Sequence, residues 1–554
     1  MKTFYLFICL MSSTCVVAQN NNGRFTHADT LRGSITPERA WWNVLRYDIT
    51  VKPDYEKKYI SGSNIITYEV VQKEHPRIMQ IDLKEPLQID SIIYDNRKKL
   101  DYERKGSVFY VKTEEQAMSS KHTVAIYYSG NPHVAVRPPW DGGWTFATDD
   151  KGRPWMTVTC METGASIWFP LKDHLSEEPD NGATLTMIVP NDLVGVANGR
   201  LLERTENNDG TTSYKWGVEN PISNYSLIPN IGHYINFNET YLGLRGNLDL
   251  NYWVMDYNLE KAKNYMPNQV HKMLDSFEYW FGPYPFYKDG YKLIETDNTG
   301  MEHQTAVTYG NHYQFGYRGR GGALGLTFDF IIVHESGHEW FGNNITMKDI
   351  ADMYLHESFT NYSETLYVDY FNGKEAANDY NFEGRQGIKN DKPIIGPYGV
   401  NAIGSKDMYV KGGNMLHTIR HSIDNDKLFR NILAGLNFTF HNKTVEGKQI
   451  QDYISQKAGH DYTRVFYQYL NTTQIPELNL YVDGVNGKMF YKWAQCVDGF
   501  NLPLSLRGDS EHMRIVPTKE WQSADVRPRE QYLFNPLRIE KMYYIKVNLV
   551  KSME

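Results

Sequence analysis

Cysteine is scarce in this sequence, with four in 554 residues. Cys9 and Cys15 lie in the first 18 residues, which we interpret below as an export signal. Cys160 and Cys496 are far apart in the chain and fall in different predicted domains. We therefore expect two buried free thiols and no disulfide framework. Stability must then come from hydrophobic cores, for which the chain is long enough.

Long apolar runs and a strong charge of one sign are also missing. After residue 18 no stretch is long and apolar enough for a transmembrane helix, so we predict no integral membrane segment once a signal is cleaved. Lys and Arg number 58 and Asp and Glu number 66, giving a formal net charge of −8. This mild acidic excess argues against a nucleic-acid partner and against a polybasic membrane patch. No pattern indicates an oligomer, and we expect a monomer.

The first 18 residues are typical of a cleaved secretion signal. A basic start is followed by an apolar run at residues 4–11, and Val16 and Ala18 occupy the −3 and −1 positions of a cut after Ala18. The alternative is a lipoprotein signal that uses Cys15, but residues 12–14 are a poor lipobox. We expect export across the inner membrane, to the periplasm.

Periodicity divides the rest of the chain. Residues 19–35 are polar at first and are predicted to be a flexible lead. Short segments with period-two alternation, broken by Gly, Asp, Asn and Pro, predict a β-rich domain over residues 36–256. Helical periodicity begins near Leu259 and predicts a domain over residues 257–472, and strand patterns return over residues 473–554.

The clearest chemical signal lies in the helical domain. Residues 328–343 read FDFIIVHESGHEWFGN, an apolar lead followed by H-E-x-x-H. On an α-helix, His334 and His338 would lie one turn apart on the same face. Zinc accepts neutral imidazole nitrogens, and a catalytic zinc site has three protein ligands and leaves the fourth position to water. The spacing therefore predicts two of the three ligands.

The third ligand must come from another part of the chain. Glu357 follows His338 by 19 residues, which leaves room for one helix to end and a second to pack against it. His356 competes for this role, although it would point elsewhere if Glu357 points inward. Glu364 lies two helical turns after Glu357, where it either accepts the outer N–H of a ligating histidine or is an ordinary solvated glutamate.

Three motifs in one order resemble the M1 family of zinc metallopeptidases, the group of aminopeptidase N. The first is His334–His338 with Glu357 downstream. The second is Thr299-Gly300-Met301-Glu302-His303, which is similar to the family's G-x-M-E-N segment, and the third is Tyr409-Val410-Lys411-Gly412, which is similar to its Y-x-K-G segment. Together they extend over residues 281–413, counting the upstream Phe281-Gly282-Pro283-Tyr284-Pro285.

The resemblance implies a multidomain α+β fold. Residues 36–256 would form the saddle-shaped N-terminal β-domain of M1 enzymes, and residues 257–472 a thermolysin-like zinc peptidase domain. Residues 473–554 are too few for the large helical C-terminal domain of many relatives, so we predict a small β-sandwich and a more open cleft.

The resemblance also implies the roles of individual residues. Glu335 would be the general base beside one Zn²⁺ ion held by His334, His338 and Glu357. The phenol of Tyr409 would donate a hydrogen bond to the developing oxyanion. Gly300 and Met301 would line the cleft as a strand edge that binds an extended peptide.

Glu302 is the residue that would make such an enzyme an exopeptidase. A free α-ammonium group is positively charged at neutral pH, and a fixed carboxylate would bind it so that only the first peptide bond reaches the metal. Thr299 and His303 depart from the family, which has Gly and Asn there. Met161 also occupies the place of a family Gln or Glu, with Glu162 beside it as a substitute substrate contact.

Residues 316–325, which include Arg318 and Arg320 between glycines, do not continue into G-K-[ST] and so are not a phosphate loop. We expect a flexible loop over the mouth of the cleft.

The resemblance thus implies a secreted zinc aminopeptidase acting on peptides. Two alternatives remain. One is a related zinc hydrolase whose substrate has no free N-terminus, as the departures at Met161, Thr299 and His303 would allow. The other is a peptide-binding protein that has lost catalysis, although the presence of Glu335 and all three predicted ligands counts against it.

Overall fold

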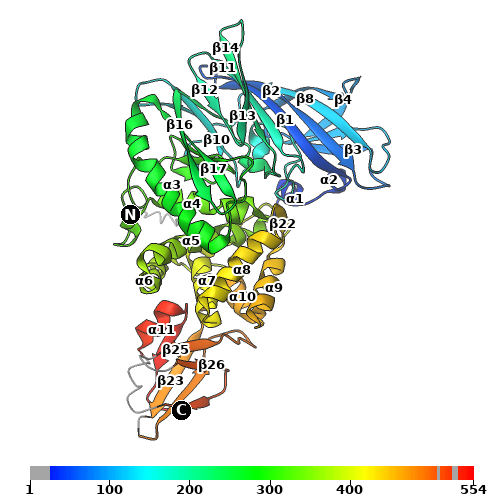
Figure 1. Cartoon of the computed structure of the whole chain (residues 1–554). Helices are drawn as coiled ribbons and strands as arrows, with labels where there is room; N and C mark the ends of the chain where they lie inside the picture. Colours follow the sequence, from blue (N-terminus) through cyan, green and yellow to red (C-terminus); the bar gives the residue numbers. More distant parts are fainter. Residues whose placement is uncertain (1–24, 484, 508–511, 527–534, 554) are drawn as a thin grey trace, which may run out of the picture.

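The computed structural model describes residues 25–483, 485–507, 512–526 and 535–553. A β-rich N-terminal region, a largely helical central region and a small C-terminal region of short sheets follow one another along the molecule (Figure 1). This arrangement confirms the predicted multidomain α+β fold class. The predicted signal, Cys15 included, lies outside the described residues.

The N-terminal region consists of three sheets. An eight-stranded sheet has the order β13-β14-β11-β1-β2-β8-β4-β5, and β12-β15-β10-β9 and β3-β7-β6 form the other two. Buried and partly exposed residues alternate along its strands, as predicted from the sequence. The bounds are β1 Trp42–Asp54, β2 Tyr59–Val70, β3 Ile78–Asp82, β4 Gln88–Tyr94, β5 Lys98–Lys99, β6 Tyr102–Lys105, β7 Val108–Lys112, β8 Lys121–Gly130, β9 Gly143–Thr148, β10 Pro154–Thr159, β11 Ala183–Pro190, β12 Val194–Val196, β13 Arg200–Glu206, β14 Thr211–Val218 and β15 Asn230–Gly232.

The prediction of a flexible lead over residues 19–35 is wrong for its last part. Helix α1 (His27–Gly33) starts at a capping box in which Thr26 and Asp29 bond each other's backbone N–H. A second short helix, α2 (Pro37–Ala40), follows. Arg32 pairs with Asp173 at 3.7 Å and donates to the carbonyl of Glu162. Polar composition suggested a loose segment, whereas these long-range contacts fix it.

The central region carries a five-stranded sheet, β16-β17-β18-β20-β19, beside a group of helices. Short β19 lies at the sheet edge and pairs only with β20, through Gly300↔Tyr309 and Met301↔Thr308. The bounds are β16 Tyr234–Gly243, β17 Gly246–Met255, α3 Leu259–Phe281, β18 Tyr291–Glu295, β19 Gly300–Met301, β20 Val307–Tyr309, α4 Phe330–Gly337, β21 Ile345–Met347, α5 Tyr354–Asn372, α6 Lys374–Gly384, α7 Val410–Ile423, α8 Asp426–Thr439, β22 Lys443–Val445, α9 Gly447–Ala458 and α10 Thr463–Asn471.

The predicted boundary after residue 256 falls too late for this sheet. Strands β16 and β17 precede that boundary, yet β17 pairs in parallel with β18, from Leu250↔Tyr291 to Trp253↔Ile294. Leu248 and Leu250 are fully buried in the core of the central region. Alternation predicts a strand equally well in either domain, so periodicity could not say to which sheet this hairpin belongs.

The C-terminal region contains a four-stranded sheet, β27-β24-β23-β28, and a two-stranded sheet, β25-β26. Its apolar residues, among them Leu478 and Trp493, belong to the same core cluster as the central helices. Within the described ranges, no helix has both the length and the apolar character needed to cross a bilayer. The bounds are β23 Glu477–Asp483, β24 Lys488–Trp493, β25 Leu504–Arg507, β26 His512–Ile515, β27 Gln522–Asp525, α11 Pro536–Met542 and β28 Lys546–Leu549.

Candidate active site

The H-E-x-x-H segment lies on α4, which is anchored at its start. Asp329 is the N-cap and accepts the Ile332 N–H at 3.2 Å. The same carboxylate accepts the hydroxyls of Tyr265 and Tyr309 at 3.0 and 2.8 Å. The helix ends at Gly337, and His338 keeps a helical backbone as its C-cap. The beginning of the helix is therefore held from several sides.

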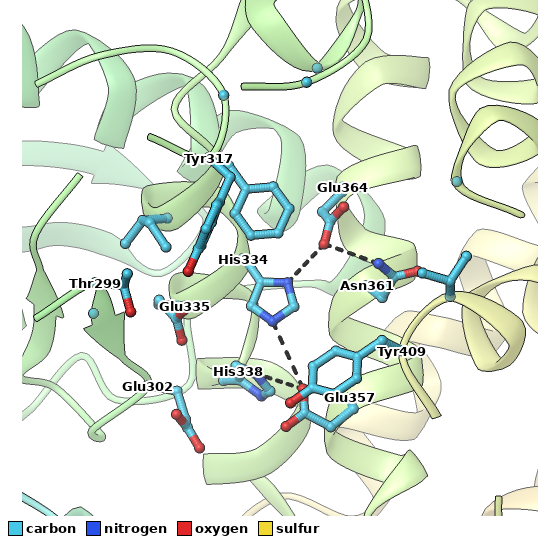
Figure 2. Close-up of a pocket in the computed structure, with 18 of the residues that line it drawn as sticks. Thr299, Glu302, Tyr317, His334, Glu335, His338, Glu357, Asn361, Glu364 and Tyr409 are labelled. Atoms are coloured by element: carbon cyan, nitrogen blue, oxygen red, sulfur yellow. Dashed lines mark hydrogen bonds and ion pairs between the residues drawn. The ribbon is translucent and has the colours of Figure 1, made fainter. Parts of the chain in front are cut away.

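Helix α5 packs closely on α4 because Gly337 has no side chain. A Cβ there would lie 2.7 Å from the Ser363 hydroxyl and 3.1 Å from the Thr360 methyl group. This approach brings Glu357, on the first turn of α5, to the two histidines. The Glu357 Oε2 lies 3.8 Å from His334 Nε2 and 3.6 Å from His338 Nε2 (Figure 2).

The other ring nitrogens of both histidines face away from this cluster and are hydrogen-bonded. His334 Nδ1 is 2.7 Å from the Glu364 Oε1, and His338 Nδ1 is 3.1 Å from the carbonyl oxygen of Phe341. Because a carboxylate and a carbonyl only accept, each Nδ1 carries the proton. Each Nε2 is then left with a free lone pair directed at Glu357. Glu364 thus occupies the position that its spacing predicted.

These residues fit a zinc ion. Their ligand atoms lie within 4.8 Å of one another, and the donor set of two imidazoles and one carboxylate is a typical zinc set. Glu357 Oε2 is buried and has no hydrogen-bond partner among the described residues. Burial raises the pKa of Glu357 to about 8, as expected for a buried carboxyl group without a cation beside it. A divalent cation would remove that cost.

His356, the rival for the third ligand, is directed elsewhere. Its Nε2 accepts the Met347 N–H at 2.9 Å, and its ring is fully buried. Its ring centroid lies 6.5 Å from that of His338. The histidine therefore stabilises the segment before α5, while Glu357 faces the cluster.

Glu335 and Glu302 lie on the far side of the ligand cluster from α5. Together with His338 they place ligand-type atoms within 4.8 Å of one another. Burial raises the pKa of Glu335 to about 8. Burial also raises the pKa of Glu302, whose Oε1 has no hydrogen-bond partner within the described ranges. Glu302 therefore presents a buried acceptor that a bound cation could satisfy.

The edge strand before Glu302 can be this close to α4 only with glycine at position 300. Gly300 has φ +136°, and a Cβ there would lie 2.6 Å from the Thr308 carbonyl oxygen and 2.8 Å from the Ile331 side chain. Met301 and Thr299 line the same cavity. His303 does not line it, and both of its ring nitrogens are buried without a hydrogen-bond partner among the described residues.

Tyr409, just before α7, completes the wall opposite Glu302. Its ring stacks on that of His334 with centroids 6.2 Å apart and 25° between the planes. Burial and the neighbouring Glu357 carboxylate raise the pKa of the Tyr409 hydroxyl well above its ordinary value. The phenol therefore keeps its proton and remains a hydrogen-bond donor (Figure 2).

A cavity of about 600 Å³ joins these residues. Met161 and Glu162 line it, but the Glu162 side chain is exposed, and the hydrogen bonds that hold this residue, from Arg32 and Asn401, go to its carbonyl oxygen. The cavity also includes Trp140 and Tyr317. The predicted site residues are thus brought together on one cavity.

Several residues of the site were not predicted. Tyr380, on α6, donates to Glu364 at 2.6 Å, and Thr360 contacts His338 Nδ1 at 3.1 Å. The Phe330 ring stacks on His334 with centroids 5.2 Å apart. Phe330 precedes His334 by four residues, so helical spacing could have indicated it. Nothing in the sequence around Tyr380 distinguishes it from the many other tyrosines.

Known proteins of the same fold support this arrangement. A crystal structure of an M1 zinc metallopeptidase E323A mutant from Deinococcus radiodurans superposes with a TM-score of 0.66 at 18% identity, over 79% of this chain and 96% of that one. Aminopeptidase A from Legionella pneumophila, in complex with aspartic acid, gives a TM-score of 0.71 at 15% identity, over 92% of this chain and 60% of that one. At these identities the likeness concerns the fold.

Sequence relatives are aminopeptidases. Aminopeptidase N of Lactobacillus helveticus is 25% identical over 273 residues, which are 46% of this chain and 29% of the relative. Aminopeptidase N of Canis lupus familiaris is 29% identical over 206 residues, 35% of this chain and 20% of the relative. The matched segments thus cover less than a third of either relative.

Two models of one family match consecutive parts of the chain. The Peptidase M1 N-terminal domain matches residues 43–226, and the Peptidase family M1 domain matches residues 265–469, which contain the whole ligand cluster. Together they extend over most of the sequence and confirm the resemblance drawn from the three motifs. The chain belongs to peptidase family M1.

Proposed function

We propose that this protein is a zinc-dependent aminopeptidase that hydrolyses the first peptide bond of peptides. The observation that carries the proposal is the placement of Glu302 beside a complete His334, His338 and Glu357 ligand set, with Glu335 between. A metal site alone would suit any hydrolase of this class. A buried carboxylate next to it suits a substrate with a free α-ammonium group.

The chain's own groups suit peptide hydrolysis. Zinc held by the three ligands would supply a Lewis acid that polarises a carbonyl group and acidifies water. Glu335, which is not one of the three ligands, is placed to accept a proton from the attacking water and to pass it to the departing amine. Tyr409 is placed to donate its hydroxyl hydrogen to the oxyanion, a contribution of about 3 kcal/mol in comparable sites.

Peptide positioning follows from the edge strand. Met301 and Thr299 line the cavity at β19, and an extended peptide can add to such an edge through main-chain hydrogen bonds. Glu302, at the end of this edge, would bind the α-ammonium group and limit how far the peptide can enter. Cleavage would then be confined to the first bond.

The test compares free aminoacyl fluorogenic amides with their N-acetylated forms. We expect cleavage of the free forms only, lost on treatment with a chelator and restored by zinc. Glu335→Gln should lower kcat by about 10²- to 10⁴-fold, the usual contribution of a positioned acid–base group. Equal cleavage of both forms would favour a hydrolase that needs no free N-terminus. Peptide binding without turnover would favour a binding protein.

We also propose that the protein acts outside the inner membrane, in the periplasm. The support is the signal-like sequence of residues 1–18, with Val16 and Ala18 before the expected cut. N-terminal sequencing of the protein from a periplasmic fraction should give Gln19 as the first residue. A lipid-modified Cys15 in the membrane fraction would favour the lipoprotein alternative.

A further inference from the structure

The active-site cavity is lined by many acids and by a single permanent cation. Its lining includes the carboxyl groups of Glu162, Glu302, Glu335, Glu357, Glu364 and Glu383. Arg320 is the only lysine or arginine among the described residues that line it. The mechanism proposed above leaves Arg320 without a role.

Arg320 has no internal partner for its charge. The side chain is exposed, and its guanidinium forms no ion pair or hydrogen bond with any residue that the structure describes. Glu383 lines the same cavity but is not paired with it. An unpaired guanidinium facing a cavity is available for an anionic group of a ligand, and it suits a carboxylate because it can bind both oxygens.

The backbone holds Arg320 in a tight turn next to the metal ligands. Tyr317 and Arg320 exchange backbone hydrogen bonds of 2.9 and 3.1 Å. The Tyr317 ring packs edge-on against Phe330 at 5.6 Å, and Phe330 stacks on His334. One aromatic ring therefore separates this turn from a metal ligand, and the turn is part of the site.

The turn lies at the opposite end of the site from Glu302. Figure 2 shows Glu302 below the ligand cluster and Tyr317 above it, with Thr299 and Glu335 between. A peptide whose α-ammonium group is bound at Glu302 and whose first peptide bond lies at the ligand cluster must extend its remaining residues towards Tyr317. Its leaving part then approaches the turn that carries Arg320.

We propose that Arg320 binds a carboxylate on the leaving part of the substrate, so that the enzyme prefers short peptides with a free C-terminus. An acidic side chain in the same part would offer the same chemistry. The inference rests on the proposed aminopeptidase function and adds the second charged anchor to it. Glu302 binds the positive end of the substrate, and Arg320 binds the negative end.

The test uses the zinc-loaded full chain and four substrates with the same first residue. These are a tripeptide acid, its C-terminal amide, the amide with glutamate as last residue, and an aminoacyl fluorogenic amide that has no carboxylate. The variants are Arg320→Gln and Arg318→Gln. Arg318 is exposed on the same turn but does not line the cavity, so it is a matched control.

We expect the wild type and Arg318→Gln to prefer the tripeptide acid over its amide by about fivefold in kcat/KM, the upper range for an exposed charge pair. Arg320→Gln should lose this preference through KM with kcat little changed, because a contact made equally in ground and transition states affects binding only. Cleavage of the fluorogenic amide should be the same in all three proteins.

Several outcomes would overturn the proposal. A wild type that cleaves the acid and the amide equally, or a preference that Arg320→Gln retains, would exclude a carboxylate contact at Arg320. A preference only for the glutamate-containing amide would exclude the C-terminal carboxylate and assign the acidic side chain instead. A wild type that does not cleave even the fluorogenic amide would overturn the proposed function itself.

Discussion

The two walls of the cavity hold their side chains very differently. On the inner wall, His334, His338 and Glu357 are at most 7% exposed, and each histidine is oriented through its outer nitrogen. On the outer wall, Glu162 and Arg320 are exposed, and neither side chain has a hydrogen-bond or ion-pair partner among the described residues.

This difference separates two tasks. Metal binding and proton transfer need groups fixed to a fraction of an ångström, and buried hydrogen bonds provide that order before substrate arrives. Choice among peptides needs charges that can adapt, and exposed side chains on loops provide it. We therefore expect substitutions on the inner wall to affect metal content and kcat, and those on the outer wall to affect KM.

The largest effect should follow loss of the inner-wall carboxylate. Glu357→Ala should abolish detectable turnover and stoichiometric zinc binding, because two imidazoles remain where three protein ligands are needed. Metal analysis of purified protein, with thermal unfolding at several zinc concentrations, measures this. Zinc should raise the Tm of the wild type and leave that of the variant unchanged.

His356→Gln is the matched control for that experiment. It removes the rival histidine, whose Nε2 accepts the Met347 N–H. We expect a lower free energy of unfolding by about 1–3 kcal/mol, the cost of disturbing a buried hydrogen bond, with zinc content retained. Loss of zinc in His356→Gln with retention in Glu357→Ala would reverse the ligand assignment.

Tyr409→Phe should have the next largest effect. Removing one oxyanion donor lowers kcat by about 10²- to 10³-fold in comparable enzymes. Zinc content and KM should change little, because Tyr409 is not one of the three clustered ligands. Steady-state kinetics beside metal analysis separates the two. Loss of zinc with the phenol would show that Tyr409 acts on the metal site and not on the oxyanion.

Glu364→Gln should have a smaller effect, on affinity. Glu364 fixes the His334 tautomer, and losing such a partner typically weakens metal binding by about 10- to 100-fold. Competition with a chelator of known affinity measures it. Tyr380→Phe, which removes one donor to Glu364, should weaken zinc less than Glu364→Gln. Equal effects would show that Glu364 is not the residue that matters.

The smallest effect is expected on the outer wall. Glu162→Gln should change kcat/KM for free aminoacyl amides by less than about fivefold, because an exposed charge contributes at most about 1 kcal/mol. Any change should appear in KM. A large fall in kcat would instead place Glu162 on the N-terminus of the substrate, as the register of the sequence motif allows.

Local sequence predicted the inner wall well. His334 and His338 lie on adjacent turns because H-E-x-x-H is a helical pattern, and the positions of Glu357 and Glu364 follow from one helix two turns long. The order of the β-rich, helical and small β regions was also predicted, because each has its own periodicity.

What the sequence did not predict depends on long-range contacts. Tyr380 reaches Glu364 from another helix, and α1 is held by Arg32 through contacts some 130–140 residues away. The β16–β17 hairpin joins the central sheet through pairing with β18. Composition and spacing describe segments, and these features describe how segments meet.

The most direct measurement is a crystal structure with anomalous data collected on both sides of the zinc absorption edge. The account predicts one zinc ion per chain, bound to His334 Nε2, His338 Nε2 and the Glu357 carboxylate, with Glu335 nearby but not coordinated. Zinc coordinated through His356, at another place in the chain, or at none would contradict it.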